Sequence, residues 1–317
     1  MTPIEVLRPL LRGDEHFAVT GATGWFGTTA LDLLDDLLGE QAAERVTAYA
    51  SRPRTMTTAA GRTVEVHALS ELGSSIGSTT HVLHFAFLTR DRAAELGIPD
   101  YLEQNLQITA TVLGAISRLH PRGLLTTSSG AVYDKARHMS CDLTGNPYGT
   151  LKHIDELALR QAMADIGGTS VVARVFSVAG RGITSPELYA LGAFITMAQA
   201  GGPVRVRAQG SVVRSYVGVA EVLAVGLWSL LSQIPLVFDS GGHVVEMGEL
   251  AALVAQLHGL PPDAVERTLD PDAPEDRYIG EPGQMAQLAE HCGLDFAPLA
   301  ELVEQTAAGM RAGGGSS

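Results

Sequence analysis

The chain has 317 residues, a formal net charge of −13 and an isoelectric point near 5.2. This acidity argues against general binding to nucleic acids or anionic membrane surfaces, because both carry negative charge themselves. Its 45% hydrophobic and 18% charged residues are typical of a globular domain. The two cysteines, Cys141 and Cys292, give neither a metal-binding spacing nor a disulfide framework, so we expect a cytoplasmic protein without a metal site.

The N-terminal segment, residues 1–15, is expected to form an amphipathic helical extension that packs on the outside of a sheet. Its charges at Glu5, Arg8 and Arg12 interrupt the apolar core that a signal peptide needs. The most apolar run of the chain, residues 222–231, is shorter than the roughly 20 residues that cross a bilayer. No membrane partner is therefore expected.

A predicted strand at residues 16–20 leads directly into a glycine-rich turn, and a helical pattern with Leu31, Leu34 and Leu37 follows. The glycines of the turn have the spacing G-x-x-G-x-x-G. A strand, a glycine turn and a helix in this order form a dinucleotide-binding fingerprint, in which the backbone approaches a pyrophosphate at the helix N-terminus. The cofactor-binding residues expected here are Gly21, Thr23, Gly24, Trp25, Phe26 and Gly27.

The second strand, predicted at residues 46–50, bears on the choice of cofactor. An NAD-selective site usually has an Asp or Glu at the end of this strand, where it binds the ribose 2′-hydroxyl. Here Ser51 and Arg52 follow the strand, with Arg54 close behind. Guanidinium groups suit a 2′-phosphate, so we predict NADP, with NAD as the alternative cofactor. A solvated basic loop is the structural alternative.

Further strands are predicted at residues 64–66, 81–85 and 123–127, with a long helix at residues 99–120, as in a doubly wound parallel sheet. Ala86, which follows the fourth strand, is small enough to let the nicotinamide half of a cofactor approach. Thr127 and Ser129 carry hydroxyl groups at the carboxyl end of the fifth strand, which faces the ligand crevice in such sheets. Serines that merely end a strand are the alternative.

Tyr148 and Lys152 stand four residues apart in a predicted helix, residues 148–166, so their side chains share one face at about 5–6 Å. An ammonium group at that distance favours the phenolate and is expected to lower the pKa of Tyr148. The phenol can then exchange a proton with an alcohol or a carbonyl oxygen. The chain has only one other lysine, Lys135, which indicates a need for a compact ammonium here. An amphipathic helix that carries these residues by chance is the alternative.

Together these motifs resemble the extended short-chain dehydrogenase/reductases, in particular the branch that acts on nucleotide-diphosphate sugars and is typified by UDP-galactose 4-epimerase. The residues that carry the resemblance are Thr20, Gly21, Gly24, Gly27, Ser129, Tyr148 and Lys152. Asn105 and the Asn146-Pro147-Tyr148-Gly149 tetrapeptide also match, and they contain both asparagines of the chain. The resemblance covers residues 16–309 and implies a Rossmann-type α/β fold with a smaller C-terminal substrate-binding lobe. It also implies that Asn105 belongs to the cofactor site.

In the second half of the chain the resemblance identifies candidate substrate-binding residues. Ser177 stands where the family has an asparagine that helps to hold the substrate's phosphates, and Arg214 stands where an arginine pairs with a substrate phosphate. The implied domains are the extension at residues 1–15, a dinucleotide-binding domain at 16–178 and a mainly substrate-binding lobe at 179–311. Some segments of the lobe are expected to return to the sheet, and residues 312–317 are expected to form a flexible tail.

The resemblance implies that Tyr148 exchanges a proton with a sugar oxygen while hydride passes between that carbon and the nicotinamide. Ser129 would hydrogen-bond the same oxygen, and Lys152 would orient the nicotinamide ribose. Because the region after the second strand favours NADP(H), a 4-ketoreductase is the leading prediction and a 4-epimerase the alternative. A 4,6-dehydratase would need an Asp-Glu pair where this chain has Gly130 and Ala131. A non-catalytic dinucleotide-binding sensor stays open as a different class.

Members of this family commonly dimerise through two long helices, which here would be residues 99–120 and 148–166. We expect a homodimer, because these helices carry apolar residues beyond a single core-facing stripe. Those on the first helix are Leu102, Leu106, Val112, Leu113 and Ile116.

Overall fold

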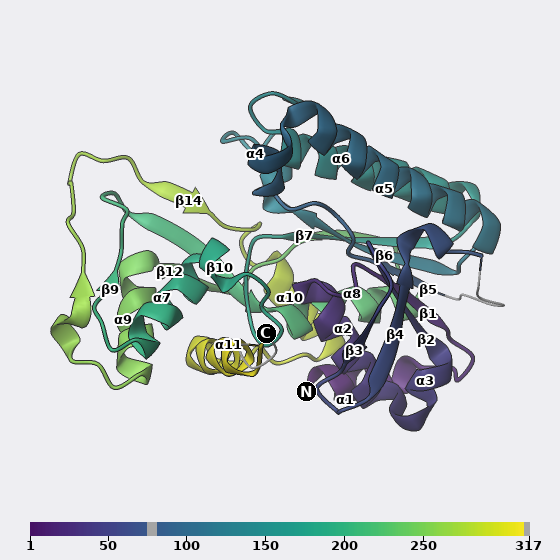
Figure 1. Cartoon of the computed structure of the whole chain (residues 1–317), viewed down its shortest axis with the longest axis horizontal. Coiled ribbons are helices and arrows are strands. Elements are labelled where there is room, and N and C mark those ends of the chain that lie inside the picture. The colour runs from purple at the N-terminus through teal and green to yellow at the C-terminus, as the bar shows by residue number, and fades with distance from the viewer. Residues whose placement is uncertain (75–80, 314–317) are drawn as a thin grey trace.

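An eight-stranded sheet forms the centre of the larger part of this computed structural model, which describes residues 1–74 and 81–313 (Figure 1). The strand order is β11-β7-β6-β5-β1-β2-β4-β3, and every neighbouring pair is parallel except β3 with β4. The strands are β1 Phe17–Thr20, β2 Val46–Ala50, β3 Arg54–Thr57, β4 Thr63–Ala68, β5 His81–His84, β6 Gly123–Ser129, β7 Thr169–Val175 and β11 Leu236–Asp239. This topology confirms the predicted doubly wound α/β fold.

The central strands β1, β5 and β6 are buried along their whole length, because helices cover both faces of the sheet. In the register of the sheet, Thr20 at the end of β1 lies opposite Tyr49 and His84, and His84 lies opposite Thr126 of β6. The loops after β1, β5 and β6 therefore all leave the sheet at the carboxyl ends of its parallel strands.

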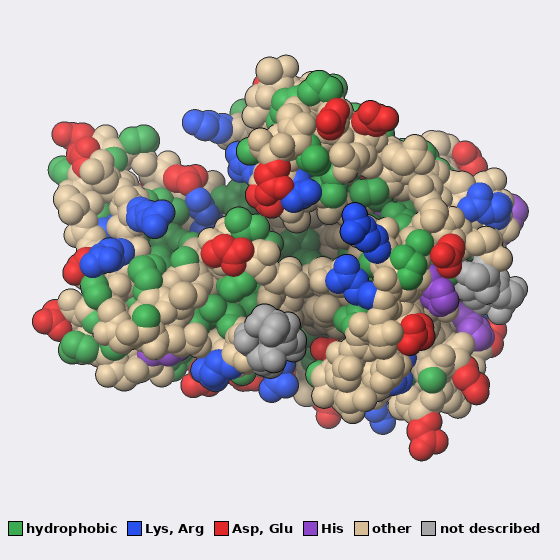
Figure 2. All heavy atoms as spheres, viewed as in Figure 1, with side chains coloured by type: hydrophobic (Ala, Val, Ile, Leu, Met, Phe, Trp, Pro, Cys, Tyr) green, Lys and Arg blue, Asp and Glu red, His purple; other side chains and the backbone are tan. Residues whose placement is uncertain are grey.

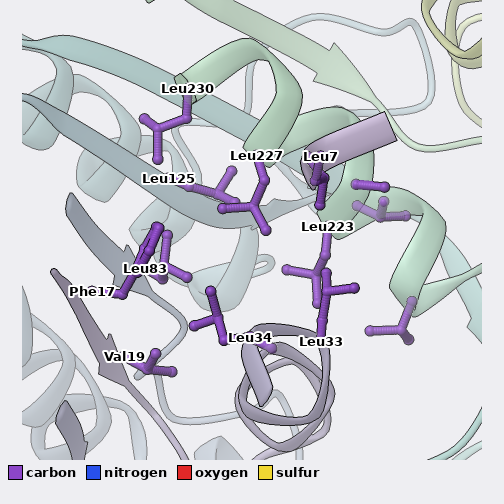
Figure 3. Packing of buried hydrophobic residues seen from close by; sticks show 14 of the residues in the cluster. Leu7, Phe17, Val19, Leu33, Leu34, Leu83, Leu125, Leu223, Leu227 and Leu230 are labelled. Atoms are coloured by element: carbon purple, nitrogen blue, oxygen red, sulfur yellow. The ribbon is translucent and has the colours of Figure 1, made fainter. Parts of the chain in front are cut away.

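Helices α2 Trp25–Leu38 and α8 Val219–Leu231 cover one face of the sheet, and α5 Ile98–Leu119 and α6 Pro147–Asp165 cover the other (Figure 1). Figure 3 shows leucines of α2 and α8 packed toward the strands, with these residues labelled: Leu33, Leu34, Leu223, Leu227, Leu230, Phe17, Val19, Leu83 and Leu125. The apolar run at residues 222–231 is thus part of a core helix, apolar on nearly all sides because it is buried on nearly all sides. No helix within the described residues is long and apolar enough to cross a membrane.

The N-terminal extension differs from its prediction in length and in contact. Only α1 Pro3–Leu7 is helical, followed by a 3₁₀ turn at Arg8–Leu10, where Pro9 cannot continue the α-helical hydrogen bonds. The segment packs against α2 and α8 rather than against the sheet, and the buried side chain of Leu7 lies beside Leu223 in Figure 3.

The segment that follows β2 also differs from its prediction. Arg54, expected in a cofactor-binding loop, begins β3, which pairs antiparallel with β4 at the edge of the sheet. Two short helices, α3 Ala42–Arg45 and α4 Arg92–Leu96, were not predicted either. None of these additions changes the order of the central strands.

The second half of the chain builds a lobe with its own hydrophobic cluster and returns α8, β11 and α10 Gln284–Cys292 to the main sheet. The helices of the lobe are α7 Ala190–Gln199, α9 Met247–Leu257 and α11 Leu299–Gly313. Its strands are β8 Ser177–Ala179, β9 Val204–Arg205, β10 Val212–Gly218, β12 His243–Glu246, β13 Val265–Glu266 and β14 Asp276–Tyr278. The first two residues of the predicted tail, 312 and 313, belong to α11, and residues 314–317 lie outside the described residues.

Two residues expected on a dimer surface belong to the core. Val112 and Ile116 of α5 are 0% and 1% exposed, and they pack with residues of β1, β5 and α6. Leu106 on the same helix and Leu157 on α6 are 45% and 54% exposed, so an apolar outer face remains on this pair of helices.

Candidate active site

A cleft of about 700 Å³ opens at the edge where β1, β5, β6 and β7 end. Its walls come from the glycine turn, the residues after β5, the end of β6, the start of α6 and residues 184–189 of the lobe. Figure 2 shows the molecule hollowed between its two parts, with Lys and Arg side chains around the rim. The predicted site residues that line the cleft are Gly21, Gly24, Trp25, Phe26, Gly27, Thr127, Ser129, Tyr148 and Lys152.

The three glycines of the turn have different structural roles. Gly21 has a φ of +67°, and a Cβ there would lie 2.6 Å from the backbone nitrogen of Ala86. A Cβ on Gly27 would lie 2.1 Å from the carbonyl oxygen of Gly21, so this glycine is needed for close packing of α2 on β1. A Cβ on Gly24 would meet only one atom, at 3.4 Å. Gly24 is the N-cap of α2 and provides no side-chain hydrogen bond, and the first turn has no acidic residue, so the N-terminus of α2 fits a pyrophosphate.

Contacts at the start of α6 bring Ser129 and Tyr148 together. Asn146 accepts a hydrogen bond from the Gly149 N–H at 3.0 Å and donates its amide to the carbonyl oxygen of Ala131 at 2.8 Å. A Cβ on Gly149 would lie 1.9 Å from that same carbonyl oxygen, so the helix can approach only with glycine at this position. Ser129 Oγ accepts from the Ala131 N–H at 3.1 Å, and Tyr148 lines the same cleft. A serine hydroxyl and a phenol thus lie together at the cleft.

Lys152 is buried, with 5% of its surface exposed. Its Nζ donates to the carbonyl oxygen of Thr127 at 2.7 Å and lies 3.9 Å from the ring centroid of Phe87. The Phe87 ring also packs edge-on against Tyr148, with centroids 5.9 Å apart. Burial lowers the pKa of Lys152 to about 8, so the ammonium stays mainly charged at neutral pH.

The pKa of Tyr148 shifts opposite to the expected direction. Burial raises it above the usual value, the neighbouring Tyr278 adds to the effect, and the hydrogen bond with Ser129 opposes it. Lys152 directs its ammonium to a backbone carbonyl and an aromatic ring instead of lowering this pKa. Tyr148 is therefore a protonated phenol at neutral pH.

Tyr278 of β14 is a site residue that the sequence analysis missed. Its hydroxyl lies 3.3 Å from Ser129 Oγ, and its ring centroid lies 4.7 Å from that of Phe176. The residue falls in the Pro- and Asp-rich stretch of residues 261–281, where no periodic pattern marks it. Only the pairing of β14 with β10, which sets Tyr278 opposite Arg214, brings it to the site.

Several predicted cofactor residues lie outside the cleft lining. Ser51 and Arg52 are exposed between β2 and β3, and Thr23 is half-buried in the glycine turn. Asn105 is 1% exposed; it accepts a hydrogen bond from the Leu88 N–H at 2.9 Å and so braces the loop after β5 from behind. Ala86 lies in that loop, where its backbone packs against Gly21.

The two predicted phosphate-binding residues also lie outside the cleft lining. Ser177 pairs with Tyr216 between β8 and β10. Arg214 donates to the Asp276 carboxylate at 2.6 Å, on the neighbouring strand β14. Arg90, which was not predicted, does line the cleft and is exposed.

A second cavity, of about 660 Å³, lies between the N-terminal segment, α2 and α11. It contains none of the predicted site residues, and carboxylates of Asp32, Glu221 and Glu301 are among its walls. We therefore assign the chemistry to the first cleft, where hydroxyl, phenol and ammonium groups meet.

Comparison with known proteins identifies the family of the chain. The sequence profile described as "NAD dependent epimerase/dehydratase family" matches residues 17–235. No curated protein matches the chain in sequence at a significant level.

Solved structures of similar shape cover nearly the whole chain. A double mutant of DesIV, a dTDP-glucose 4,6-dehydratase from Streptomyces venezuelae solved with NAD, has a TM-score of 0.73 at 19% identity, covering 95% of this chain and 98% of that one. The UDP-glucose 4-epimerase of Thermus thermophilus in complex with NAD has a TM-score of 0.71 at 21% identity, covering 93% of this chain and 99% of that one. The UDP-N-acetylglucosamine 4-epimerase of Methanobrevibacter ruminantium has a TM-score of 0.72 at 17% identity, covering 95% of this chain and 99% of that one. At these identities the likeness shows a shared fold.

Proposed function

Because the chain belongs to the NAD-dependent epimerase/dehydratase family, we propose that it transfers hydride between a nicotinamide cofactor and a carbon of a nucleotide-diphosphate sugar. One observation carries this proposal: a single cleft is lined by Ser129, Tyr148, Lys152 and the glycine turn at the start of α2. The turn suits the pyrophosphate of a dinucleotide, and a bound nicotinamide would supply the hydride chemistry.

The chain itself supplies the proton and the orientation. Tyr148, kept protonated by burial, donates a proton to the sugar oxygen as negative charge develops there. Ser129 hydrogen-bonds the same oxygen and stabilises that charge. Lys152 holds a ribose hydroxyl and keeps a positive charge beside the reacting groups. Arg90 on the cleft wall, with Arg214 once it leaves Asp276, offers guanidinium groups for the substrate's phosphates.

Within this chemistry we favour an NADP(H)-dependent 4-ketoreductase. Reduction of a ketone needs a proton donor, and the phenol of Tyr148, which lines the cleft and keeps its proton at neutral pH, is available as that donor. No carboxylate follows β2, and Arg52 is exposed at the place where a 2′-phosphate would lie. A 4-epimerase with tightly bound NAD(P) is the second candidate, supported by the family description and by the epimerases of similar fold.

The packing around Gly130 argues against a 4,6-dehydratase. A Cβ on Gly130 would lie 2.4 Å from the Phe176 ring, so an acidic side chain would not fit at this position. A non-catalytic sensor is also disfavoured, because a sensor has no need of Ser129, Tyr148 and Lys152 in one cleft.

An assay of candidate sugars with both cofactors tests the function. Purified protein is mixed with NADPH or NADH and a set of nucleotide-linked 4-keto sugars, and with nucleotide-linked glucose and galactose. A reductase consumes NADPH in proportion to the keto sugar, as followed by nicotinamide absorbance. An epimerase interconverts the two hexoses with no net cofactor consumption. Turnover of neither group, with cofactor binding intact, would contradict an enzymatic role on these sugars.

The cofactor preference rests on Arg52. Removal of a charged hydrogen-bond partner costs about 1.5–3 kcal/mol, so Arg52→Ala should weaken NADPH binding at least about tenfold and leave NADH nearly unchanged. Arg54→Ala is the matched control, because Arg54 is already part of β3. Fluorescence titration measures the four affinities. Tighter NADH binding by the unchanged protein would refute the NADP assignment.

We also propose a homodimer in the cytoplasm. The outer faces of α5 and α6 expose Leu106, Ile154 and Leu157, and both cysteines are free, as a reducing compartment allows. Light scattering should give twice the monomer mass at micromolar concentration. Leu157→Glu should dissociate the dimer, whereas Leu269→Glu, at an exposed leucine of the lobe, should not. A monomeric unchanged protein would exclude this interface.

A further inference from the structure

A fully buried carboxylate lies on the face of α6 that also carries Lys152. Asp155 is 2% exposed and follows Lys152 by three residues, one helical turn along the same face. Thr109 of α5 donates its hydroxyl to Asp155 Oδ1 at 2.7 Å. On the other side, His84 Nε2 lies 3.9 Å from Asp155 Oδ2. The carboxylate therefore has one strong hydrogen bond and one imidazole neighbour.

His84 does not neutralise this carboxylate. Burial lowers the pKa of His84 to about 4, so the imidazole is neutral at neutral pH. Thr20 Oγ1 lies 2.7 Å from His84 Nδ1 and also receives the backbone N–H of Phe85, which leaves the Thr20 hydroxyl proton for Nδ1. The remaining proton of the ring is then on Nε2, the nitrogen nearer to Asp155. A neutral N–H can polarise a carboxylate but adds no charge.

The neighbouring acid of α6 has its own cation. Glu156 accepts from Arg174 of β7 through both Nε, at 3.0 Å, and Nη2, at 2.7 Å. Within the described part of the chain, Asp155 makes no ion pair with a lysine or an arginine, and Lys152 makes none with an acid. An unpaired buried charge is costly, so two opposite buried charges one turn apart on a helix stabilise one another.

The charge of Lys152 depends on its surroundings. Burial lowers the pKa of Lys152 to about 8, and Asp155 and then Glu156 act in the opposite direction. From β5 the neutral ring of His84 is the other titratable group that interacts with Lys152. Since Glu156 is engaged by Arg174, Asp155 is the carboxylate free to balance the ammonium.

We propose that Asp155 is a positioning residue, whose buried carboxylate keeps the ammonium of Lys152 charged and fixed beside the cleft. The hydrogen bond from Thr109 fixes the carboxylate on one side, and on the other side His84, which Thr20 contacts, lies 3.9 Å from it. The role for catalysis rests on the proposed function of Lys152, but the electrostatic pairing does not require that any substrate be known.

Nuclear magnetic resonance of isotope-labelled lysine tests the pairing directly. The chain contains two lysines, Lys135 and Lys152, so Lys135→Arg leaves a single lysine signal. In this background the pH titration of Lys152 is recorded without cofactor or substrate. Asp155→Asn keeps the shape and removes the charge. The ratio of charged to neutral Lys152 at a given pH should then fall on the order of tenfold, the effect of losing one nearby opposite charge.

Thr109→Val is the matched control, because it removes the hydrogen bond to Asp155 and keeps its charge; the Lys152 titration should stay close to that of the unchanged protein. NADPH titration gives a second readout: Asp155→Asn should weaken binding more at alkaline pH than at pH 7, where more of Lys152 is charged. The proposal would be overturned if Lys152 titrated at the same pH in Asp155→Asn as in the unchanged protein. It would also be overturned if Thr109→Val shifted the Lys152 titration as much as Asp155→Asn does.

A folding failure of Asp155→Asn would leave the unchanged protein to decide. If Lys152 there has already lost its charge well below pH 8, Asp155 does not hold it and the proposal fails. A shifted lysine titration in a protein that turns over no nucleotide sugar would retain the pairing and reject the proposed function.

Discussion

The contact between Gly149 and the carbonyl oxygen of Ala131 decides how closely α6 approaches the end of β6. A methyl group on Gly149 would lie 1.9 Å from that oxygen, whereas real contacts of this kind stay beyond 3.0 Å. In Gly149→Ala the helix start must therefore move by about 1 Å or more relative to Ser129, and Tyr148 moves with it. A displacement of about 1 Å at reacting groups can cost on the order of 10²-fold in rate. Crowding of this kind also costs about 1–3 kcal/mol of stability.

The assay compares kcat, NADPH affinity and urea unfolding for Gly149→Ala and a control. Gly114→Ala is matched, because Gly114 is also helical and a Cβ there would meet only the flexible Arg118 side chain, at 3.3 Å. The control should keep its activity and gain up to about 1 kcal/mol from better helix propensity. Gly149→Ala should lose about 100-fold in kcat while it still binds NADPH at the glycine turn. Normal kcat and stability in Gly149→Ala would refute this account of how Ser129 and Tyr148 are held together.

Two further predictions concern protons. Tyr148→Phe keeps the ring and removes the phenolic oxygen, so it should fold and bind cofactor normally but lose on the order of 10²–10⁴ in kcat; near-normal turnover would make Tyr148 a packing residue. Burial lowers the pKa of His81 and His84 to about 4, while the unfolded chain keeps the ordinary value near 6.5. The unfolded state then binds more protons, and the free energy of unfolding should fall as pH drops from about 6.5 to about 4, by at most on the order of 3 kcal/mol per histidine. Urea titrations should show a shallower fall for His81→Gln, and an identical pH profile would contradict this origin.

The parts of the fold that could be predicted are those with strong local patterns. Uniformly apolar strands, the glycine turn and the periodic helix that contains Tyr148 all appear where expected, because each pattern is set by residues close in sequence. The junction of Asn146 and Gly149 was recognised as a motif, although its role as the contact with Ala131 needed the structure.

The parts that could not be predicted depend on pairing between distant segments. β3 forms only because β4 offers an edge, and β14 becomes a strand only beside β10. Tyr278 therefore reaches Ser129, and Arg214 meets Asp276, through contacts that no local pattern encodes. The apolar stretch of α8 gave no helical period, since it is buried on nearly every side.

The pKa of Tyr148 could not be predicted from the sequence for a third reason. Helical spacing correctly places Lys152 on the same face, but spacing describes Cβ positions, and a lysine side chain reaches several ångströms further. In the structure that reach takes the ammonium to Thr127 and Phe87, which leaves burial as the dominant effect on the phenol. The phenol and the cation beside it thus have their pKa values set by separate surroundings: that of Tyr148 by burial near Tyr278, and that of Lys152 by burial, which the carboxylate one turn along α6 opposes. Changes at one group should consequently leave the protonation state of the other largely intact.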